Sequence, residues 1–204
     1  MTDLSKFLPY IYPALPEVSD MEFIANTRRA CIEFCRLTRV WQIDLEPMDI
    51  VAGQSNYSML LPPEADLSKV LTVVVDGQEL LPISERLHGN SQGSTGFYNV
   101  NHSDKKIILS SIPANDITVG LQISVALQPT IVTFDVPEIL FNTYPEAISL
   151  GAIANLCAIM GRPFGNLEMA KLYREEFRMA INAATSDASY GFSRAVLNTT
   201  PSYI

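Results

Sequence analysis

The sequence predicts an α+β protein: a helical bundle, made of one helix near the N-terminus and a helical hairpin near the C-terminus, with an antiparallel β region inserted between them. Three observations predict this fold. Apolar residues recur at helical spacing in residues 19–40, and helical spacing returns in residues 136–190. Between them, in residues 41–135, apolar and polar residues alternate in short runs that turn residues separate. A period of two is typical of half-buried strands, whereas a period near 3.6 indicates amphipathic helices.

The N-terminal segment is predicted to be an arm followed by a helix. Residues 1–18 contain three prolines and are expected to be extended. Ser19 and Glu22 have the spacing of a capping box, so the first helix is expected to span residues 19–40. One side of this helix is apolar and includes Cys31 and Cys35. The opposite side is basic and carries Arg28, Arg29, Arg36 and Arg39.

Residues 41–135 are expected to form about six to eight short antiparallel strands. Trp41 begins the alternating pattern, and Asp76 followed by Gly77 is a strong signal for a two-residue hairpin. A second hairpin is expected around residues 101–104, and a last long strand over residues 121–133. Strands of this length and number favour a β-sandwich or a small barrel.

Two helices and a tail are predicted after the β region. Thr143 begins a second capping box, and its helix is expected to run to about Met160. Asn166 is expected to cap a final helix that runs to about Ser189, and the short linker makes the two helices an antiparallel hairpin. The first of them carries small residues that would let another helix approach closely: Ala147, Gly151, Ala154 and Ala158. Residues 191–204 have no periodicity and one charge, and are predicted to be an extended tail.

Charge is low and unevenly distributed. Charged residues make up 18% of the chain and the net charge is −8. Residues 41–136 hold eleven acidic and four basic residues, which gives −7 of that total. Such a balance argues against a protein that grips nucleic acid, because phosphate binding needs an excess of Lys and Arg. It is compatible with a surface along which DNA slides.

Cysteine usage and hydropathy indicate a protein of the reducing cytosol that does not enter a membrane. The three cysteines lack the spacing of a disulfide framework, and no secretory signal is visible at the N-terminus. The most apolar run, residues 147–160, has about 14 residues. A membrane-spanning helix needs about 20, so this run is expected to be a buried helix.

No catalytic, cofactor or metal site is predicted. The two histidines, His88 and His102, lie in polar loops, and the chain has no G-x-S-x-G, P-loop or G-x-G-x-x-G motif. Cys31 and Cys35 are spaced to reach one metal ion, but they coincide with the apolar side of their helix and match no common zinc motif. Three acidic pairs raise the question of carboxylate chemistry and are better explained as solvated faces: Asp44/Glu46, Glu64/Asp66 and Glu175/Glu176.

Two features are candidate binding determinants. The arginine side of the first helix can contact an acidic partner or a neighbouring subunit, form salt bridges within the bundle, or, on weaker grounds, touch nucleic acid. The tail is apolar and aromatic, unlike most disordered termini, and is long enough to lie across a neighbour. Its candidate contact residues are Phe192, Arg194, Val196, Leu197, Tyr203 and Ile204.

Several runs of the sequence resemble the head-to-tail adaptor proteins of tailed bacteriophages, some of which are called tail tubular protein A-like. The likeness covers about residues 16–189 and is one of layout and loose runs. The runs that carry it are Arg28–Trp41 (RRACIEFCRLTRVW), Asp49–Tyr57 (DIVAGQSNY), Val136–Glu138 (VPE), Tyr144–Ile148 (YPEAI) and Gly161–Asn166 (GRPFGN).

The resemblance implies a structural virion protein and not an enzyme. In that family twelve subunits form a ring beneath the portal, join the capsid to the tail and continue the DNA channel, through which DNA passes without sequence-specific binding. The helices and the C-terminal tail engage the portal protein, and the β part faces the tail nozzle or tail tube protein. The protein would then assemble in the host cytoplasm and reside in the neck of the virion.

Two alternatives remain at this point. The chain can instead be a tail-completion or neck protein of another tailed-phage type. It can also, with less support, be a small hydrolase or metal-dependent enzyme that uses the loop at residues 84–95 with His88 and His102.

Overall fold

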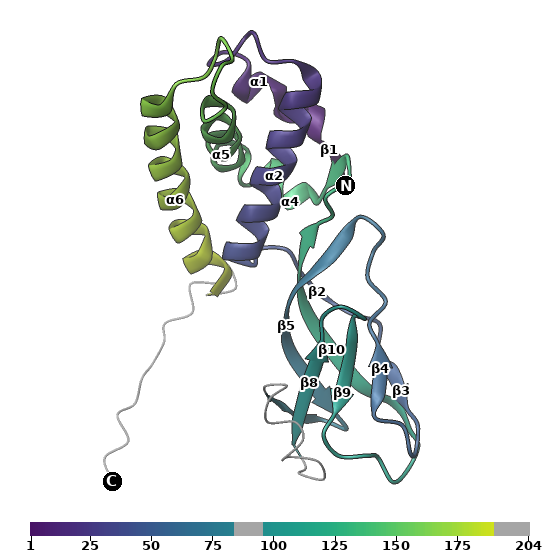
Figure 1. Cartoon of the computed structure of the whole chain (residues 1–204). Coiled ribbons are helices and arrows are strands. Elements are labelled where there is room, and N and C mark those ends of the chain that lie inside the picture. The colour runs from purple at the N-terminus through teal and green to yellow at the C-terminus, as the bar shows by residue number, and fades with distance from the viewer. Residues whose placement is uncertain (84–95, 190–204) are drawn as a thin grey trace, which may run out of the picture.

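The computed structural model describes residues 1–83 and 96–189, and in this part the chain is mixed α+β. The molecule is elongated, with helices at one end and two β-sheets at the other (Figure 1). The chain enters the helical part first, crosses to the β part, and returns to the helical part for its last helices. The predicted α+β class is therefore confirmed.

The extended arm predicted for residues 1–18 is wrong. The chain begins with strand β1 (Thr2–Asp3), continues as the 3-10 helix η1 (Leu4–Phe7) and then as the short helix α1 (Leu8–Ile11). The buried side chains Leu4, Phe7 and Ile11 recur every three or four residues, which is helical spacing. Pro9 lies in the first turn of α1, where its missing N–H costs nothing, so the prolines do not prevent a helix here.

Helix α2 (Asp20–Thr38) starts where the capping box predicts. The backbone N–H of Glu22 donates to Ser19 Oγ over 3.4 Å, and Ser19 Oγ donates to the Glu22 carboxylate over 2.7 Å. The helix ends at Arg39, which adopts the left-handed conformation with φ of 57° and donates its N–H to Cys35 O. This turn directs the chain from the helical part into the first strand of the β part.

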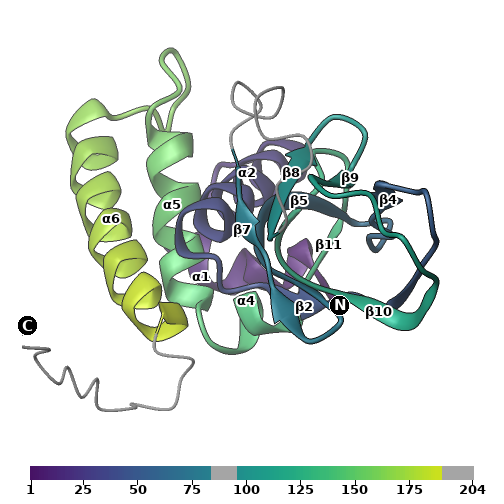
Figure 2. The same cartoon turned by 90° about the horizontal axis from the view of Figure 1, so that it is seen from below.

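The β part consists of two sheets. The first has the order β2 (Gln42–Asp44), β10 (Ile117–Pro129), β5 (Ala65–Val75) and β6 (Gln78–Glu79), and β3 (Met48–Ile50) also pairs with β10. The second has the order β4 (Asn56–Ser58), β9 (Lys106–Leu109), β8 (Phe97–Asn101) and β7 (Leu81–Pro82). Apolar side chains from both sheets join one buried core, and the long strand β10 curls along the β part (Figure 2).

Both predicted hairpins are present. Asp76 and Gly77 have φ of 49° and 77°, as a tight hairpin turn requires, and Val75 pairs with Gln78 across it. Strands β8 and β9 pair antiparallel around a turn in which Asn101 and Asp104 bond to each other. Strand β3 was not predicted, and the chain that follows the Asp76–Gly77 turn is divided between the two sheets as β6 and β7.

The C-terminal helices are α4 (Glu138–Asn142), α5 (Pro145–Cys157) and α6 (Leu167–Ser189). The predicted cap at Thr143 is wrong, because Tyr144 precedes the helix and makes no side-chain cap bond. Asn166 caps α6 as predicted: its Oδ1 accepts from the N–H groups of Glu168 and Met169 at 3.0 and 3.2 Å. Strand β11 (Asp135–Val136) pairs with β1 and holds the N-terminus at the junction of the two parts (Figure 1).

Helices α2, α5 and α6 contact one another through a close and partly polar interface. A Cβ added to Gly151 on α5 would lie 2.8–2.9 Å from three ring atoms of Phe177 on α6, so only glycine permits this approach. The rings of Phe34 on α2 and Phe177 are stacked with centroids 6.2 Å apart. Arg174 on α6 donates to Glu33 on α2 over 2.9 Å and to Asn155 on α5 over 2.6 Å.

Candidate interaction surface

Of the four arginines on the predicted basic side of the first helix, Arg28 makes contacts within the molecule and the other three are exposed. Arg28 is half-buried, donates from Nη1 to the carbonyl of Ile131, and lies over the Phe134 ring at 5.4 Å. Arg29, Arg36 and Arg39 are exposed. Within residues 1–83 and 96–189 none of the four forms an ion pair with a carboxylate. The structure therefore supports no salt-bridge role for them inside the described helices.

The partner of Arg28 is an exposed apolar segment that the sequence did not single out. Residues 130–134 follow β10 at the junction of the two parts. Ile131, Val132 and Phe134 are 80%, 70% and 59% exposed. The sequence signal is three large apolar residues within TIVTF, but the same residues also fit the end of the strand predicted over residues 121–133.

The backbone of this segment is held at several points. Thr133 is buried, and its hydroxyl donates to Asp135 O at 2.8 Å and accepts from Asp135 N at 3.1 Å. Leu4 N donates to Phe134 O at 3.0 Å. Together with the Arg28 bond, these contacts orient three apolar side chains outward on a fixed backbone.

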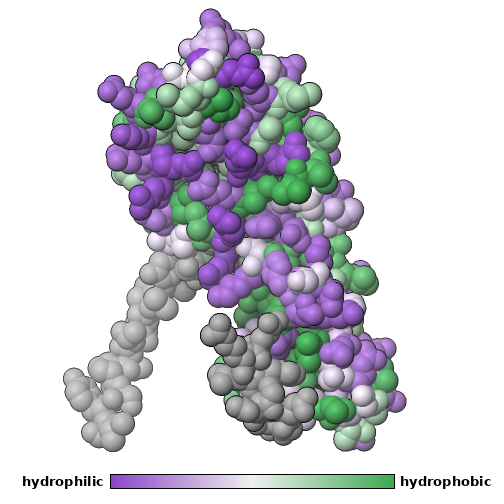
Figure 3. Space-filling model, viewed as in Figure 1, coloured by the Kyte–Doolittle hydropathy of each residue, from purple (hydrophilic) through white to green (hydrophobic). Residues whose placement is uncertain are grey.

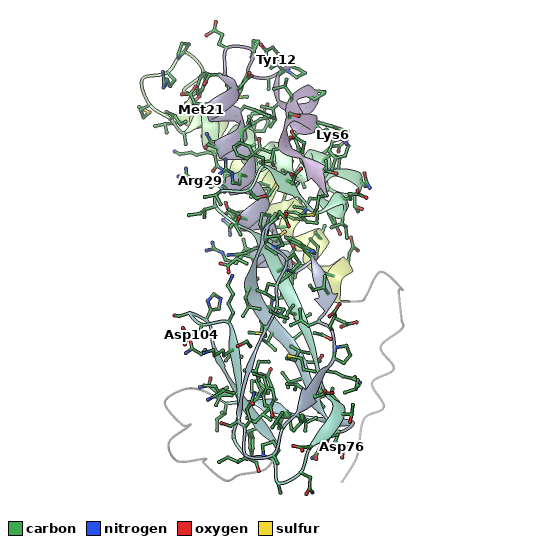
Figure 4. All side chains as sticks on the ribbon, turned by 90° about the vertical axis from the view of Figure 1, so that its right-hand side faces the viewer. Lys6, Tyr12, Met21, Arg29, Asp76 and Asp104 are labelled. Atoms are coloured by element: carbon green, nitrogen blue, oxygen red, sulfur yellow. The ribbon has the colours of Figure 1, made fainter. Side chains whose placement is uncertain are left out.

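A hollow of about 410 Å³ lies beside the segment. It is lined by residues of α2, by Ile131 and by Ile159, and Arg28 and Arg29 supply its charge. In the side-chain view Arg29 projects outward from α2 (Figure 4). Hydrophobic atoms gather on the molecular surface near the junction of the helical and β parts (Figure 3). An apolar surface beside arginines that form no ion pair with the described residues is the composition expected of a protein interface.

Helix α6 presents a second apolar surface. Its inner side is buried through Ala170, Phe177 and Ala184. At 100° per residue, Leu172 and Met179 point in the opposite direction, and they are 48% and 71% exposed. Exposed acidic residues flank this outer stripe: Glu168, Glu175 and Glu176.

The β part holds the negative charge. Its described residues, 41–83 and 96–136, contain ten acidic and three basic residues, a balance of −7. One of the three bases is neutralised, because Lys105 lies 2.9 Å from Asp66. Burial raises the pKa of Asp66, but the hydrogen bond and the charge of Lys105, together with smaller effects that include the N–H of Leu67, leave that pKa below its ordinary value. Asp76 and Asp104 lie at the far end and at the edge of the β part (Figure 4).

The other acidic pairs are accounted for locally or are exposed. Asp44 accepts from the Ser124 hydroxyl across the β2–β10 pair, and Glu46 is exposed. Glu175 and Glu176 are exposed on α6. Across the described ranges, 1–83 and 96–189, no three His, Cys, Asp or Glu side chains converge on a point that a metal ion could occupy.

The candidate nucleophiles and bases are not brought together in the described residues. His102 Nε2 lies 2.9 Å from Leu67 O, whereas His88 lies outside the described residues. Cys31 and Cys35 are fully buried, and burial raises the pKa of both thiols. A thiol with a raised pKa stays protonated at neutral pH and is a poor nucleophile and metal ligand.

The predicted contact residues of the tail all lie outside the described residues: Phe192, Arg194, Val196, Leu197, Tyr203 and Ile204. Among the residues that are described, no helix is both long enough and apolar enough to cross a membrane.

No protein-family model matches the sequence, and no curated protein is significantly similar to it.

Proposed function

We propose that the chain is a structural subunit of a tailed-phage neck: a head-to-tail adaptor that forms a ring beneath the portal, joins capsid to tail and continues the DNA channel. The observation that carries the proposal is the separation of surfaces along an elongated molecule. Exposed apolar and arginine-rich surfaces lie on the helical part, and the excess of acidic residues lies on the β part.

The charge separation fits a subunit of a DNA channel. A balance of ten acidic to three basic residues repels the phosphate backbone, so DNA that passes along such a wall would not be held. The proposal places at least part of the acidic β surface on the channel. The resemblance in the runs at residues 28–57 and 136–166 provides the family context for this role.

The fold suits a clamp between two rings. We treat α2, α5 and α6 as one bundle that docks on the portal, and the two β-sheets as an inserted sandwich that faces the tail. The tail residues 191–204 are assigned to portal contact on the basis of the resemblance. The exposed arginines Arg29, Arg36 and Arg39 are available to acidic groups of a partner.

Electron microscopy of the full chain mixed with the portal of the same phage tests the proposal. We expect stacked rings, with the chain forming a second ring of the same symmetry on the portal. A chain that never associates with the portal would contradict the proposal. Association with the tail-tube protein in place of the portal would favour the neck-protein alternative.

A shortened chain that ends at residue 190 tests the assignment of the tail. We expect it to lose portal association by at least about tenfold, because a segment that the sequence predicts to be extended and apolar would contribute several contacts in each subunit. The unfolding midpoint of the shortened chain is measured alongside, so that a loss of fold is recognised. Unchanged portal association in a folded shortened chain would remove these residues from the interface.

A further inference from the structure

We infer that the apolar segment at residues 131–134 of one copy binds the outer stripe of α6 on the next copy, so that the two surfaces form the contact between neighbouring subunits. The inference rests on the proposed ring and assigns residues to the contact between its neighbouring subunits. The segment surface comprises Ile131, Val132, Phe134, Arg28 and Arg29. The α6 stripe comprises Met169, Leu172, Met179, Glu168, Glu175 and Glu176.

Hydrogen bonds hold the backbone of the segment in place in the single copy, before any partner binds. Its backbone is held by the bonds from Leu4 N and from the Arg28 guanidinium and by the two bonds between Thr133 and Asp135. The three apolar side chains nevertheless remain largely exposed. A fixed backbone loses little conformational entropy on binding, so exposed apolar groups of this kind are efficient interface anchors.

The α6 stripe matches this surface in chemistry. Leu172 and Met179 lie two turns apart on the outer side of α6, with Met169 one turn before Leu172. Glu168, Glu175 and Glu176 flank them, whereas Arg28 and Arg29 border the segment and its hollow. Apolar centres with acidic and basic borders of opposite sign are complementary. Among the described residues, nothing covers the outer stripe.

The two surfaces lie on different sides of the helical part. Helix α6 lies at one edge, and β1, β11 and the segment between β10 and β11 lie at the other (Figures 1 and 2). Two complementary surfaces on opposite edges make a head-to-tail contact, which repeats from copy to copy and closes a ring when the rotation permits. A two-fold dimer would instead need one surface that is complementary to itself.

Engineered disulfides test the contact directly on the full chain. A variant with Val132→Cys and Met179→Cys in the same chain is expected to form a ladder of covalent multimers on oxidation. Either single variant should form no ladder, and a mixture of the two should form heterodimers. The three native cysteines are buried, which limits competing crosslinks.

Substitutions measured by sedimentation test the energetics. Val132→Glu and Met179→Glu should each weaken self-association by about tenfold or more, because each places a charge in an apolar contact. Ile112→Glu is the matched control, since Ile112 is 64% exposed but lies in the β part, and should leave self-association unchanged. Arg29→Glu should weaken association, and adding Glu176→Arg should restore part of it.

The outcomes separate this inference from the proposed function. The inference would be overturned if rings persist with Val132→Glu and Met179→Glu, or if the parent chain stays monomeric at the highest soluble concentration. Neither result would decide whether the chain docks on the portal, which electron microscopy tests separately. Loss of portal binding with unchanged self-association would assign the segment to the portal and also overturn it. Self-association through these residues without portal docking would support the contact and contradict the adaptor role.

Discussion

At the scale of single residues, a few side chains determine how closely the helices approach. Gly151 lies directly under the Phe177 ring, and Phe177 also stacks on Phe34. The sequence indicated a helix face of small residues, but it did not indicate which of them faces an aromatic ring. Ala158, a member of the same stripe, is exposed.

Gly151→Ala is expected to destabilise the protein by about 1–3 kcal/mol, because the new methyl group would overpack the Phe177 ring. Alanine is otherwise the better helix former by about 1 kcal/mol, so a net loss of stability identifies the clash. Urea unfolding followed by circular dichroism measures the change. Adding Phe177→Leu should recover part of the loss; a Gly151→Ala protein as stable as the parent would contradict the packing.

The buried thiols of Cys31 and Cys35 are expected to resist thiol reagents in the native state and to react on unfolding. Burial raises their pKa, so above pH ~8.5 the unfolded chain loses protons that the folded chain keeps. Stability should therefore fall with rising pH, by about 0.5–1 kcal/mol per thiol at pH 9. Unfolding curves between pH 7 and pH 9 measure this slope, and Cys35→Ala should reduce it. Rapid labelling of the native protein would show that the thiols are accessible.

At the scale of elements, hydrogen bonds and ion pairs between polar side chains fix the position of one helix relative to another. Arg174 joins α6 to α2 and α5 through Glu33 and Asn155. Arg162, in the loop between α5 and α6, lies 2.8 Å from Glu22, which also takes part in the cap of α2. These polar contacts position α6 and the loop before it relative to α2 and α5.

Arg174→Met is expected to cost about 1–2 kcal/mol, because it leaves the partly buried Glu33 and Asn155 without their shared donor. The pair is partly exposed, with 37% and 30% of the two side chains accessible, which limits the loss. Arg178→Met is the control on the next turn and should change stability by less than about 0.5 kcal/mol. Arg174→Lys should restore only part of the loss, since an ammonium group cannot reproduce the guanidinium fork. Equal effects at both arginines would contradict the role of Arg174.

The hairpin turn of β5 and β6 depends on backbone conformation and not on packing. Gly77 has φ of 77°, and an added Cβ would meet nothing within 4 Å. Gly77→Ala is therefore expected to lose about 1–2 kcal/mol through the left-handed backbone alone. Thermal unfolding measures the loss, with Gln78→Ala on the next exposed residue as the control. An unchanged midpoint would show that the turn relaxes to another type.

At the scale of the whole molecule, the net charge of −8 and the position of the acidic residues predict that the protein does not bind DNA. The arginines of α2 lie on the helical part, whereas the acidic excess lies on the β part. Long-range repulsion from the β part should outweigh the local attraction of three exposed arginines.

The full chain is expected not to retard linear duplex DNA at about 50 mM salt, a condition that favours nonspecific binding. Arg29→Glu with Arg36→Glu should leave this result unchanged. A chain that binds DNA in a salt-sensitive manner, and loses binding with these two substitutions, would instead identify the arginine side of α2 as a nucleic-acid surface. Gel retardation with the parent chain and the double variant distinguishes the two outcomes.

The sequence by itself determined the features that depend on neighbouring residues. Ser19 and Asn166 cap their helices, and the Asp76–Gly77 turn forms its hairpin, because each device is completed within a few residues of chain. The β region between two helical segments, and its negative charge, follow in the same way from composition and local periodicity. The cap predicted at Thr143 shows the limit, because the chain before α5 is positioned by packing and Tyr144 takes the cap position.

Only the tertiary structure decided which surfaces are buried and which remain free. Residues 4–11 fold as short helices because Leu4, Phe7 and Ile11 pack into a core that later parts of the chain supply. The segment at residues 131–134 is exposed because Arg28, far away in sequence, holds its backbone at the junction. Contacts between distant residues leave no local pattern, so the apolar segment and its separation from the outer stripe of α6 could be identified only in the folded molecule.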